Sequence, residues 1–175
     1  MASTFSFSED NGAASGSPAK GTTRTNNRTD CNWKNIDDST TDPSAAMILA
    51  GNNSYEKFQF GVIGGTFTQL SNCKFAHTGG AFPANCTLKG LVSSTYTTPG
   101  TTANVNLTND MTSAIDINSG LSVNFSTTGP QAAGSTSTLA ATGYTQYLIT
   151  QLQTTAAAPA GLTASITLTV QYDET

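Results

Sequence analysis

The carboxyl-terminal stretch ASITLTVQYDET, residues 164–175, alternates apolar and polar side chains almost without interruption. Successive side chains of a β-strand point to opposite faces of a sheet, so a period of two predicts a strand with one face on the core. The residues expected on that core face are Ala164, Ile166, Leu168, Val170 and Tyr172. Thr, Val, Ile and Tyr also favour strands, and the segment therefore predicts an all-β fold.

Short runs of the same kind recur upstream, separated by residues that favour turns. The runs are EKFQFGV (56–62), TFTQLSNCKF (66–75), CTLKGLV (86–92), ANVNLT (103–108), LSVNF (121–125) and YTQYLITQLQT (144–154). The last of these alternates less strictly, as expected for a strand that is covered on both faces. Seven or eight strands at this spacing predict an antiparallel β-sandwich over residues 31–175, either Ig-like or jelly-roll.

The first thirty residues are more polar than the rest of the chain. After Met1, Phe5 and Phe7 are their only large apolar side chains. Such a segment buries too little surface to offset the entropy lost when it becomes ordered alone. We therefore predict that residues 1–30 form a flexible, extended amino-terminal arm. The arm is either a free tail or a segment that orders on a partner, with Phe5 and Phe7 as its anchor.

A second candidate contact segment lies between the predicted strands of the carboxyl-terminal half. Residues Thr127–Thr142 are rich in Ala, Gly and Thr and predict a long loop. Loops of this length commonly carry function. The residues predicted to bind a partner are therefore those of the arm and the start of this loop: Phe5, Phe7, Thr127, Gly129, Pro130 and Gln131.

Charged residues make up only 10% of the chain, the net charge is −4 and the isoelectric point is near 4.6. All seven Lys and Arg residues lie at or before Lys89. A nucleic-acid binder needs a basic face, and the sequence has no basic cluster, so we expect no nucleic-acid partner. It also has no apolar run long enough to span a bilayer and no signal-peptide pattern at residues 1–21, so we expect no membrane association and no classical secretion.

The residues that usually carry chemistry are few and poorly spaced. His77 is the single histidine, and its setting KFAHTGG lacks a nucleophile signature. The three cysteines, Cys31, Cys73 and Cys86, show none of the paired short spacings of zinc sites. Their odd number favours free thiols in a reducing cytosol, although one disulfide plus one free thiol is an alternative. We therefore predict no catalytic, cofactor-binding or metal-binding residues and no enzymatic activity.

Two further groups are open to a functional and a structural interpretation. Asp37, Asp38 and Asp42 carry oxygen ligands, but their spacing does not fit a calcium loop and favours turn and cap roles. Trp33 with Tyr55 or Phe58 offers a sugar-stacking surface, although the preferred interpretation is that these aromatic residues belong to the core.

Four segments together resemble a known class of protein. They are CNWKNIDD (31–38), AGNNSYEKFQF (50–60), GTFTQLSNCKFAHTGG (65–80) and QLQTTAAAPAGLTASITLTVQYDE (151–174). Their pattern resembles small β-sandwich structural proteins of tailed bacteriophages, in particular capsid decoration (cement) proteins. The resemblance covers most of residues 31–175, and its motifs are structural, so it transfers no catalytic residue.

The resemblance implies a virion structural protein that binds the outer surface of a phage head and stabilises it. The implied partners are the major capsid protein or other virion proteins, with the chain itself as a homo-oligomer. The implied location is the capsid surface, after assembly in the host cytoplasm. Two alternatives stay open: a structural protein of the tail, neck, baseplate or receptor-binding tip, and a carbohydrate-binding β-sandwich module of a cell.

Overall fold

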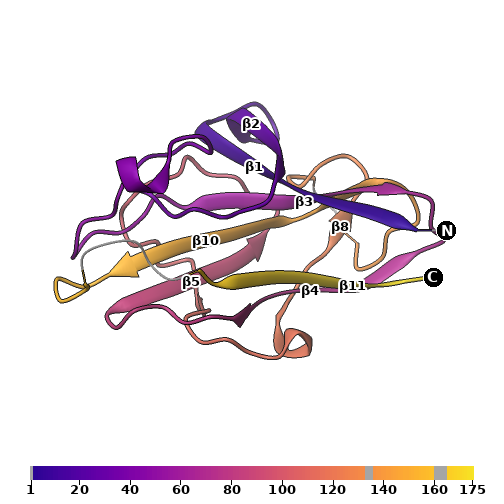
Figure 1. The fold of residues 1–175 in the computed structure, drawn as a ribbon. Helices are drawn as coiled ribbons and strands as arrows, with labels where there is room; N and C mark the ends of the chain where they lie inside the picture. The colour runs from indigo at the N-terminus through magenta and orange to yellow at the C-terminus, as the bar shows by residue number, and fades with distance from the viewer. Residues whose placement is uncertain (1, 133–135, 160–164) are drawn as a thin grey trace.

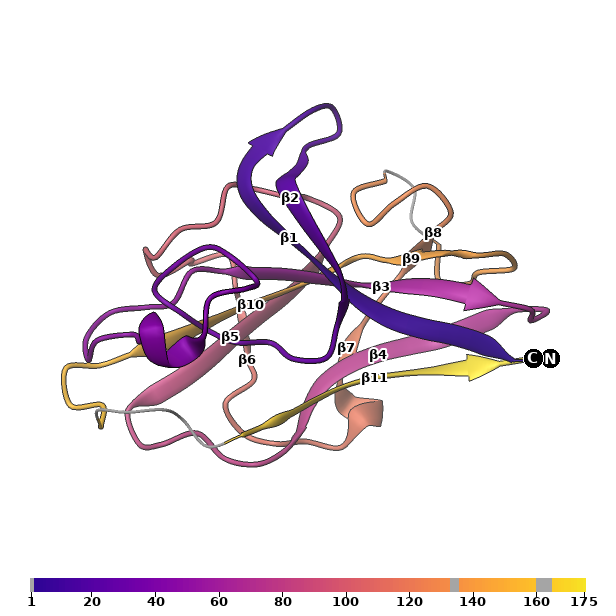
Figure 2. The same ribbon diagram turned by 45° about the horizontal axis from the view of Figure 1, so that its top comes forward.

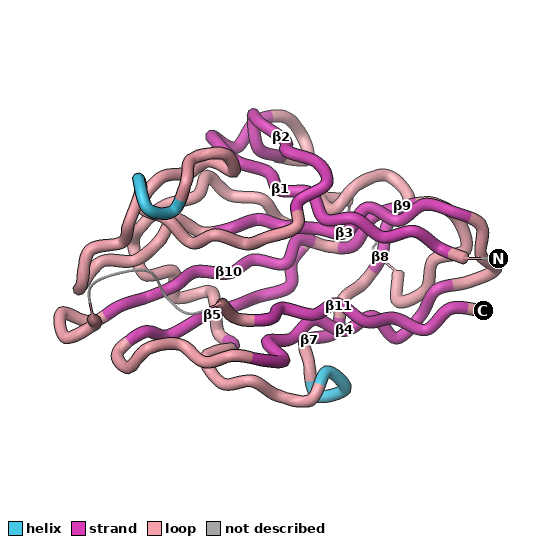
Figure 3. The backbone as a smooth tube through the Cα atoms, in the orientation of Figure 1, coloured by secondary structure: helices cyan, strands magenta, loops and turns pink. Residues whose placement is uncertain are grey.

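The structure is a computed structural model that describes residues 2–132, 136–159 and 165–175. It consists almost entirely of strands, which form two antiparallel sheets packed face to face (Figure 1). Two single 3-10 turns, at Pro43–Ala45 and Ile117–Ser119, are the helical elements in these residues (Figure 3). The prediction of an all-β, antiparallel sandwich is confirmed.

The larger sheet has eight strands. Its main path is β2 (Lys20–Arg28), β1 (Ser3–Ser15), β3 (Lys57–Gly65), β10 (Tyr147–Thr154), β5 (Cys86–Ser93) and β6 (Asn109–Asp110). The short strand β9 (Gly143–Thr145) pairs with β3 beyond the end of β10, and β8 (Phe125–Ser126) pairs with β9. The smaller sheet has three strands in the order β11 (Thr167–Glu174), β4 (Leu70–Gly79) and β7 (Leu121–Ser122).

The main core lies between the two sheets. The larger sheet contributes Ile63, Leu88 and Leu148, and the smaller sheet contributes Leu70 and Phe75. The carboxyl-terminal strand behaves as its alternation predicts: its apolar side chains pack partly buried against this core, while Thr167 and Gln171 are exposed. The side chains on the core side are Ile166, Leu168, Val170 and Tyr172. Ala164, also predicted on this face, lies outside the described residues.

A second core lies on the outer face of the larger sheet. Phe58 and Phe60 point to this side with Tyr147, and the segment 94–108 covers them through Tyr96 and Leu107. The ring centroids of Phe58 and Tyr96 are 4.6 Å apart. The central strand β10 is therefore covered on both faces, which confirms the expectation from its irregular alternation.

The strand predicted at residues 103–108 is absent, because these residues belong to that covering segment. Leu107 is buried in the second core, whereas Val105 is 87% exposed. The segment is held by side-chain hydrogen bonds instead of a strand ladder: Gln151 Nε2 donates to the Thr102 carbonyl at 3.0 Å, and its Oε1 accepts from Asn104 N–H at 3.0 Å. The run at 121–125 is also divided, into β7 and β8, which lie in different sheets.

The amino-terminal segment differs most from its prediction, because it is part of the larger sheet and not a free arm. Residues Ser3–Asp10 of β1 pair with β3, and Phe7–Ser15 pair with β2 in a hairpin that projects from the sandwich (Figure 2). Phe5 and Phe7 pack against the protein's own main core. Gly61 makes room for this strand, since a Cβ there would lie 2.4 Å from the Phe5 ring.

The two chain ends meet beside one another (Figures 1 and 2). The Ser3 N–H donates to Glu174 Oε2 at 3.0 Å, and the rings of Phe5 and Tyr172 lie 5.9 Å apart. The sandwich is therefore closed at the carboxyl end of β11. The smaller sheet has too few strands to cover the whole larger sheet, and the opposite end of the sandwich is open.

Candidate functional site

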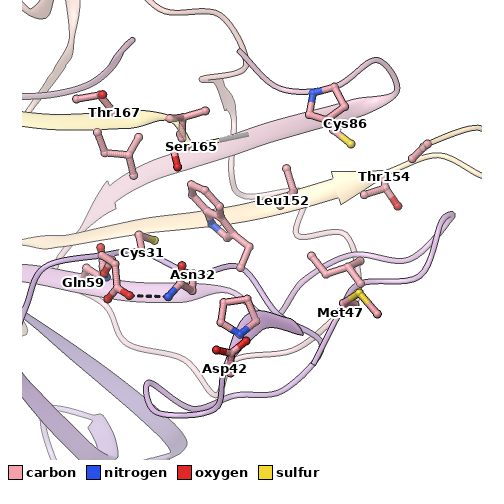
Figure 4. Close-up of a pocket in the computed structure, with 18 of the residues that line it drawn as sticks. Cys31, Asn32, Asp42, Met47, Gln59, Cys86, Leu152, Thr154, Ser165 and Thr167 are labelled. Carbon is pink, nitrogen blue, oxygen red and sulfur yellow. Dashed lines mark hydrogen bonds between the residues drawn. The ribbon is translucent and has the colours of Figure 1, made fainter. Parts of the chain in front are cut away.

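A cleft of about 740 Å³ opens between the two sheets at the amino end of β11 (Figure 4). The larger sheet contributes Phe7, Gln59 and Leu152 to its walls, and the smaller sheet contributes Phe75 and Leu168. The segment 29–50, part of the connection between β2 and β3, forms a further wall. Figure 4 shows Ser165 and Thr167 on one side of the cleft and Gln59, Cys31 and Asp42 on the other.

Trp33 and Cys31 fix the segment 29–50 on the larger sheet. Trp33 Nε1 donates to Thr150 Oγ1 at 3.1 Å, and the indole packs edge-on against Phe82 with 5.8 Å between centroids. Cys31 Sγ lies 3.8 Å from the same Thr150 oxygen. Burial raises the pKa of the Cys31 thiol to about 12, so this group is protonated at neutral pH and is a poor nucleophile.

A buried polar network lies beneath this segment. Lys57 Nζ is 3.1 Å from Glu9 Oε1, and both side chains are 1% exposed. Lys57 also donates to the Asp38 carbonyl at 2.8 Å, and Gln59 Nε2 donates to Glu9 Oε2 at 3.1 Å. Asn11 Nδ2 joins Glu9 to the connecting segment through Asp37 at 2.9 Å. The charges are paired and hydrogen-bonded, which indicates a structural role in positioning the cleft wall.

Asp38 and Asp42 have the turn and cap roles expected from the sequence, whereas Asp37 accepts from Asn11 Nδ2 at 2.9 Å and from Gly12 N–H at 2.7 Å and so binds strand β1. Asp42 caps the 3-10 turn by accepting from Ser44 N–H at 2.8 Å. Asp38 accepts from Lys34 Nζ at 2.6 Å and from Thr41 N–H at 2.9 Å. Burial alone raises the pKa of Asp38, but these hydrogen bonds outweigh it and hold the pKa well below its usual range.

A second buried charge is satisfied on the outer face of the larger sheet. Asp10 accepts from Arg24 Nε at 2.7 Å and from the Tyr147 hydroxyl at 2.6 Å. Arg24 also stacks over Phe60, 4.6 Å from the ring centroid. The pKa of Tyr147 is raised, mainly by burial and to a smaller extent by the hydrogen bond to Asp10. This arrangement locks β1, β2 and β10 together.

The mouth of the cleft is acidic and apolar. Asp30 and Asp42 are the charged residues among those that line it, so the described lining carries no Lys, Arg or His. Met47 lines the mouth and is 49% exposed, and the nearby Leu49 is 68% exposed. A solvent-exposed apolar surface beside a cleft is a common feature of binding sites.

One edge of β11 is free. In the described strands, β11 pairs with β4 along one side and with no strand along the other. An edge strand presents unpaired N–H and C=O groups to any chain that can lie beside it. Residues Ser165–Leu168 line the cleft, so the free edge begins at the cleft wall.

The predicted partner-binding residues are not brought together at this cleft. Phe7 lines it, whereas Phe5 packs toward Tyr172 at the closed end. In the predicted loop, Thr127 is exposed, Gly129 and Pro130 are buried, and Gln131 is half-buried. Part of that loop, residues 133–135, lies outside the described residues. Phe5 and Phe7 are thus core residues and not a free anchor.

The other candidate residues also have structural surroundings. His77 is buried, and its ring nitrogens lie 2.9 Å from the Met111 carbonyl and 2.8 Å from the Gly79 carbonyl. Trp33 and Phe58 belong to different faces of the larger sheet, so these two residues do not form a shared sugar-stacking surface. Cys31, Cys73 and Cys86 are free, as the odd count favoured. The described part of the chain holds no cluster of three or more His, Cys, Asp or Glu side chains suited to a metal ion.

Comparisons with family models, with curated proteins and with solved structures find no match for this chain. None of the helical turns in the described residues is long and apolar enough to cross a membrane. The function is therefore inferred from the molecule's own surfaces.

Proposed function

We propose that this protein is a virion structural protein that binds the outer surface of a bacteriophage head and stabilises it. The observation that carries the proposal is the free edge of β11 beside an open apolar cleft. These features suit a protein that works by fitting another protein. The sequence resemblance to capsid decoration proteins supplies the class of partner, namely a major capsid protein or another virion protein.

The interior of the sandwich suits a protein that has to withstand mechanical force. The larger sheet has a core on each face, and buried charged groups connect its strand β1 to β2, β3 and β10. Buried polar groups that are fully hydrogen-bonded hold a single arrangement, because any rearrangement leaves a buried charge without a partner. A rigid module of this kind transmits force between the capsid subunits that it bridges.

The proposal is tested with phage heads that lack the protein. Purified chain is added back, and binding is measured by co-sedimentation and head stability by the temperature of DNA release. A decoration protein binds in a fixed ratio to capsid subunits and raises the release temperature. Heads that bind none of it, or that release DNA at an unchanged temperature once saturated, contradict the proposal. An unrelated protein of similar size and charge serves as the control.

The same surfaces would serve a protein of the tail, neck or baseplate, and location separates the two. Quantitative mass spectrometry of purified particles gives the copy number relative to the major capsid protein. A number that follows the capsid lattice supports head decoration. A copy number equal to that of the tail proteins would show that the structural role is in the tail.

A further inference from the structure

We infer that the cleft and the free edge of β11 form an acceptor site for one extended segment of a partner protein, with alternating apolar side chains and a basic residue. The inference rests on the proposed function because it assumes a protein partner. It goes further by naming the binding site and the chemistry of the bound segment. It follows from three properties of the same surface: unpaired backbone, apolar walls and negative charge.

The unpaired backbone of β11 selects an extended polypeptide. A strand that lies along this edge gains main-chain hydrogen bonds irrespective of its sequence, as in β-strand addition. The edge is free where Ser165–Leu168 line the cleft, whereas at the other end Ser3 contacts Tyr172 and Glu174. The added segment therefore enters over the amino end of β11.

The cleft walls select alternating apolar side chains. Side chains on one face of an added strand would point into the space between the sheets, where Phe7, Trp33 and Leu152 form one wall and Ile166 and Leu168 form the other. A cleft of about 740 Å³ has room for more than one such side chain. Burying Val- or Leu-sized groups there removes their apolar surface from water and so favours binding.

The charge of the cleft selects a basic residue. Asp30 and Asp42 line the cleft without a cation among the other lining residues, although Arg28 outside the lining pairs with Asp30. The hydrogen bonds from Ser44 lower the pKa of Asp42, so this carboxylate is charged over the whole neutral range. A Lys or Arg on the segment would complement this charge and orient the segment along the edge.

The same charges disfavour a second copy of this chain as the occupant. Antiparallel pairing of two β11 strands would bring the acidic end of one copy, Asp173 and Glu174, to the amino end of the other, near Asp30 and Asp42. Like charges brought together at an interface are strongly unfavourable. The partner segment therefore belongs to a different protein.

The site is tested by selecting a random decapeptide library, displayed on a carrier, against the purified full-length chain. The expected peptides alternate apolar residues and carry Lys or Arg. Their binding should weaken with salt, and N-methylation of alternate backbone amides should abolish it. Hydrogen exchange with a selected peptide bound should show new protection at residues 165–172 and 29–33.

A matched pair of surface variants separates this cleft from other sites. Met47→Lys places a cation at the mouth and should weaken the binding of a basic peptide by about tenfold or more, because the added charge repels the Lys or Arg of the peptide. Val105→Lys makes the same change at a residue that is 87% exposed and outside the lining, and should leave affinity unchanged. Both side chains are exposed, so neither substitution should disturb folding. Equal urea midpoints for the two variants and wild type would verify this.

Several results would overturn the inference. They are a library that yields no enriched sequence, a selected peptide that binds both variants equally, protection that falls outside the cleft, and a homodimer with β11 protected. All of these measurements use the isolated chain in solution. If the chain binds the selected peptides but does not bind phage heads, only the decoration role is excluded. If it binds phage heads but no peptide, only this acceptor site is excluded.

Discussion

The Lys57 ammonium lies 3.1 Å from the Glu9 carboxylate, and the two side chains are each 1% exposed. This pair joins β1 to β3 within the sandwich, and Lys57 also holds the Asp38 carbonyl of the connecting segment. Residues 8–11, in the polar amino-terminal part of the sequence, are therefore in the interior. The wall of the cleft depends on this pair, because the segment 29–50 rests on it.

Removal of one member of the pair should be strongly destabilising. Glu9→Met leaves the Lys57 ammonium buried without its carboxylate, and the expected loss in the free energy of unfolding is about 3–5 kcal/mol. The double variant Glu9→Met/Lys57→Met removes both charges and should be more stable than Glu9→Met alone. Urea unfolding of the two variants and wild type measures this. A double variant that is no more stable than Glu9→Met would contradict the pairing.

Gly61 should be required for docking of the amino-terminal strand. A Cβ at Gly61 would lie 2.4 Å from the Phe5 ring, so Gly61→Ala must displace that ring. We expect a loss of about 1–3 kcal/mol, typical of overpacking, and faster hydrogen exchange in β1. Gly79→Ala is the control, since its added Cβ would meet its nearest atom at 3.6 Å. Equal effects of the two substitutions would be inconsistent with the packing of β1.

Asp38 should contribute to loss of stability in acid. Its pKa in the folded protein lies below the unfolded value of about 3.9, so its contribution is complete above that pH and is lost as the pH falls toward the folded pKa. Asp38→Asn should lower stability at pH 7 and flatten the decline below about pH 4. Urea midpoints between pH 7 and pH 2 measure both effects. A variant whose decline parallels wild type would exclude this role for Asp38.

The thiols should react slowly in the folded protein. Burial raises the pKa of Cys31 and of Cys73 to about 12, so very little thiolate is present at pH 8. Mass spectrometry after iodoacetamide treatment should show little alkylation of either residue in the native state and full alkylation in denaturant. Rapid native alkylation of Cys31, which lines the cleft together with Cys86, would mean that the wall formed by residues 29–50 opens readily.

The strand content was predictable from the sequence because alternation reports directly on a strand with one buried face. Ile166, Leu168 and Val170 show this most clearly, since they pack on the main core as expected. Alternation does not identify which core a face covers. Phe58 and Phe60 are buried as predicted, but in the second core outside the sandwich, which exists only because the segment 94–108 folds over the sheet.

The amino-terminal strand was not predictable from composition. A polar segment is expected to stay in water, but Glu9, Asp10 and Asn11 are buried because residues distant in sequence satisfy them: Lys57, Tyr147 and Asp37. A weak signal was available in the charge distribution, since all seven basic residues lie at or before Lys89, in the same half as these acids. No local sequence pattern predicts the cleft, because the cleft forms where the smaller sheet does not cover the larger one.

The measurement that tests the account most directly is a cryo-EM reconstruction of phage particles purified from the source of this sequence. The account predicts the chain on the outer surface of the head, arranged on the capsid lattice, with a strand of a neighbouring protein added along the free edge of β11. Its absence from the head surface would contradict the proposed decoration role. Its presence there with β11 facing solvent would contradict the acceptor site.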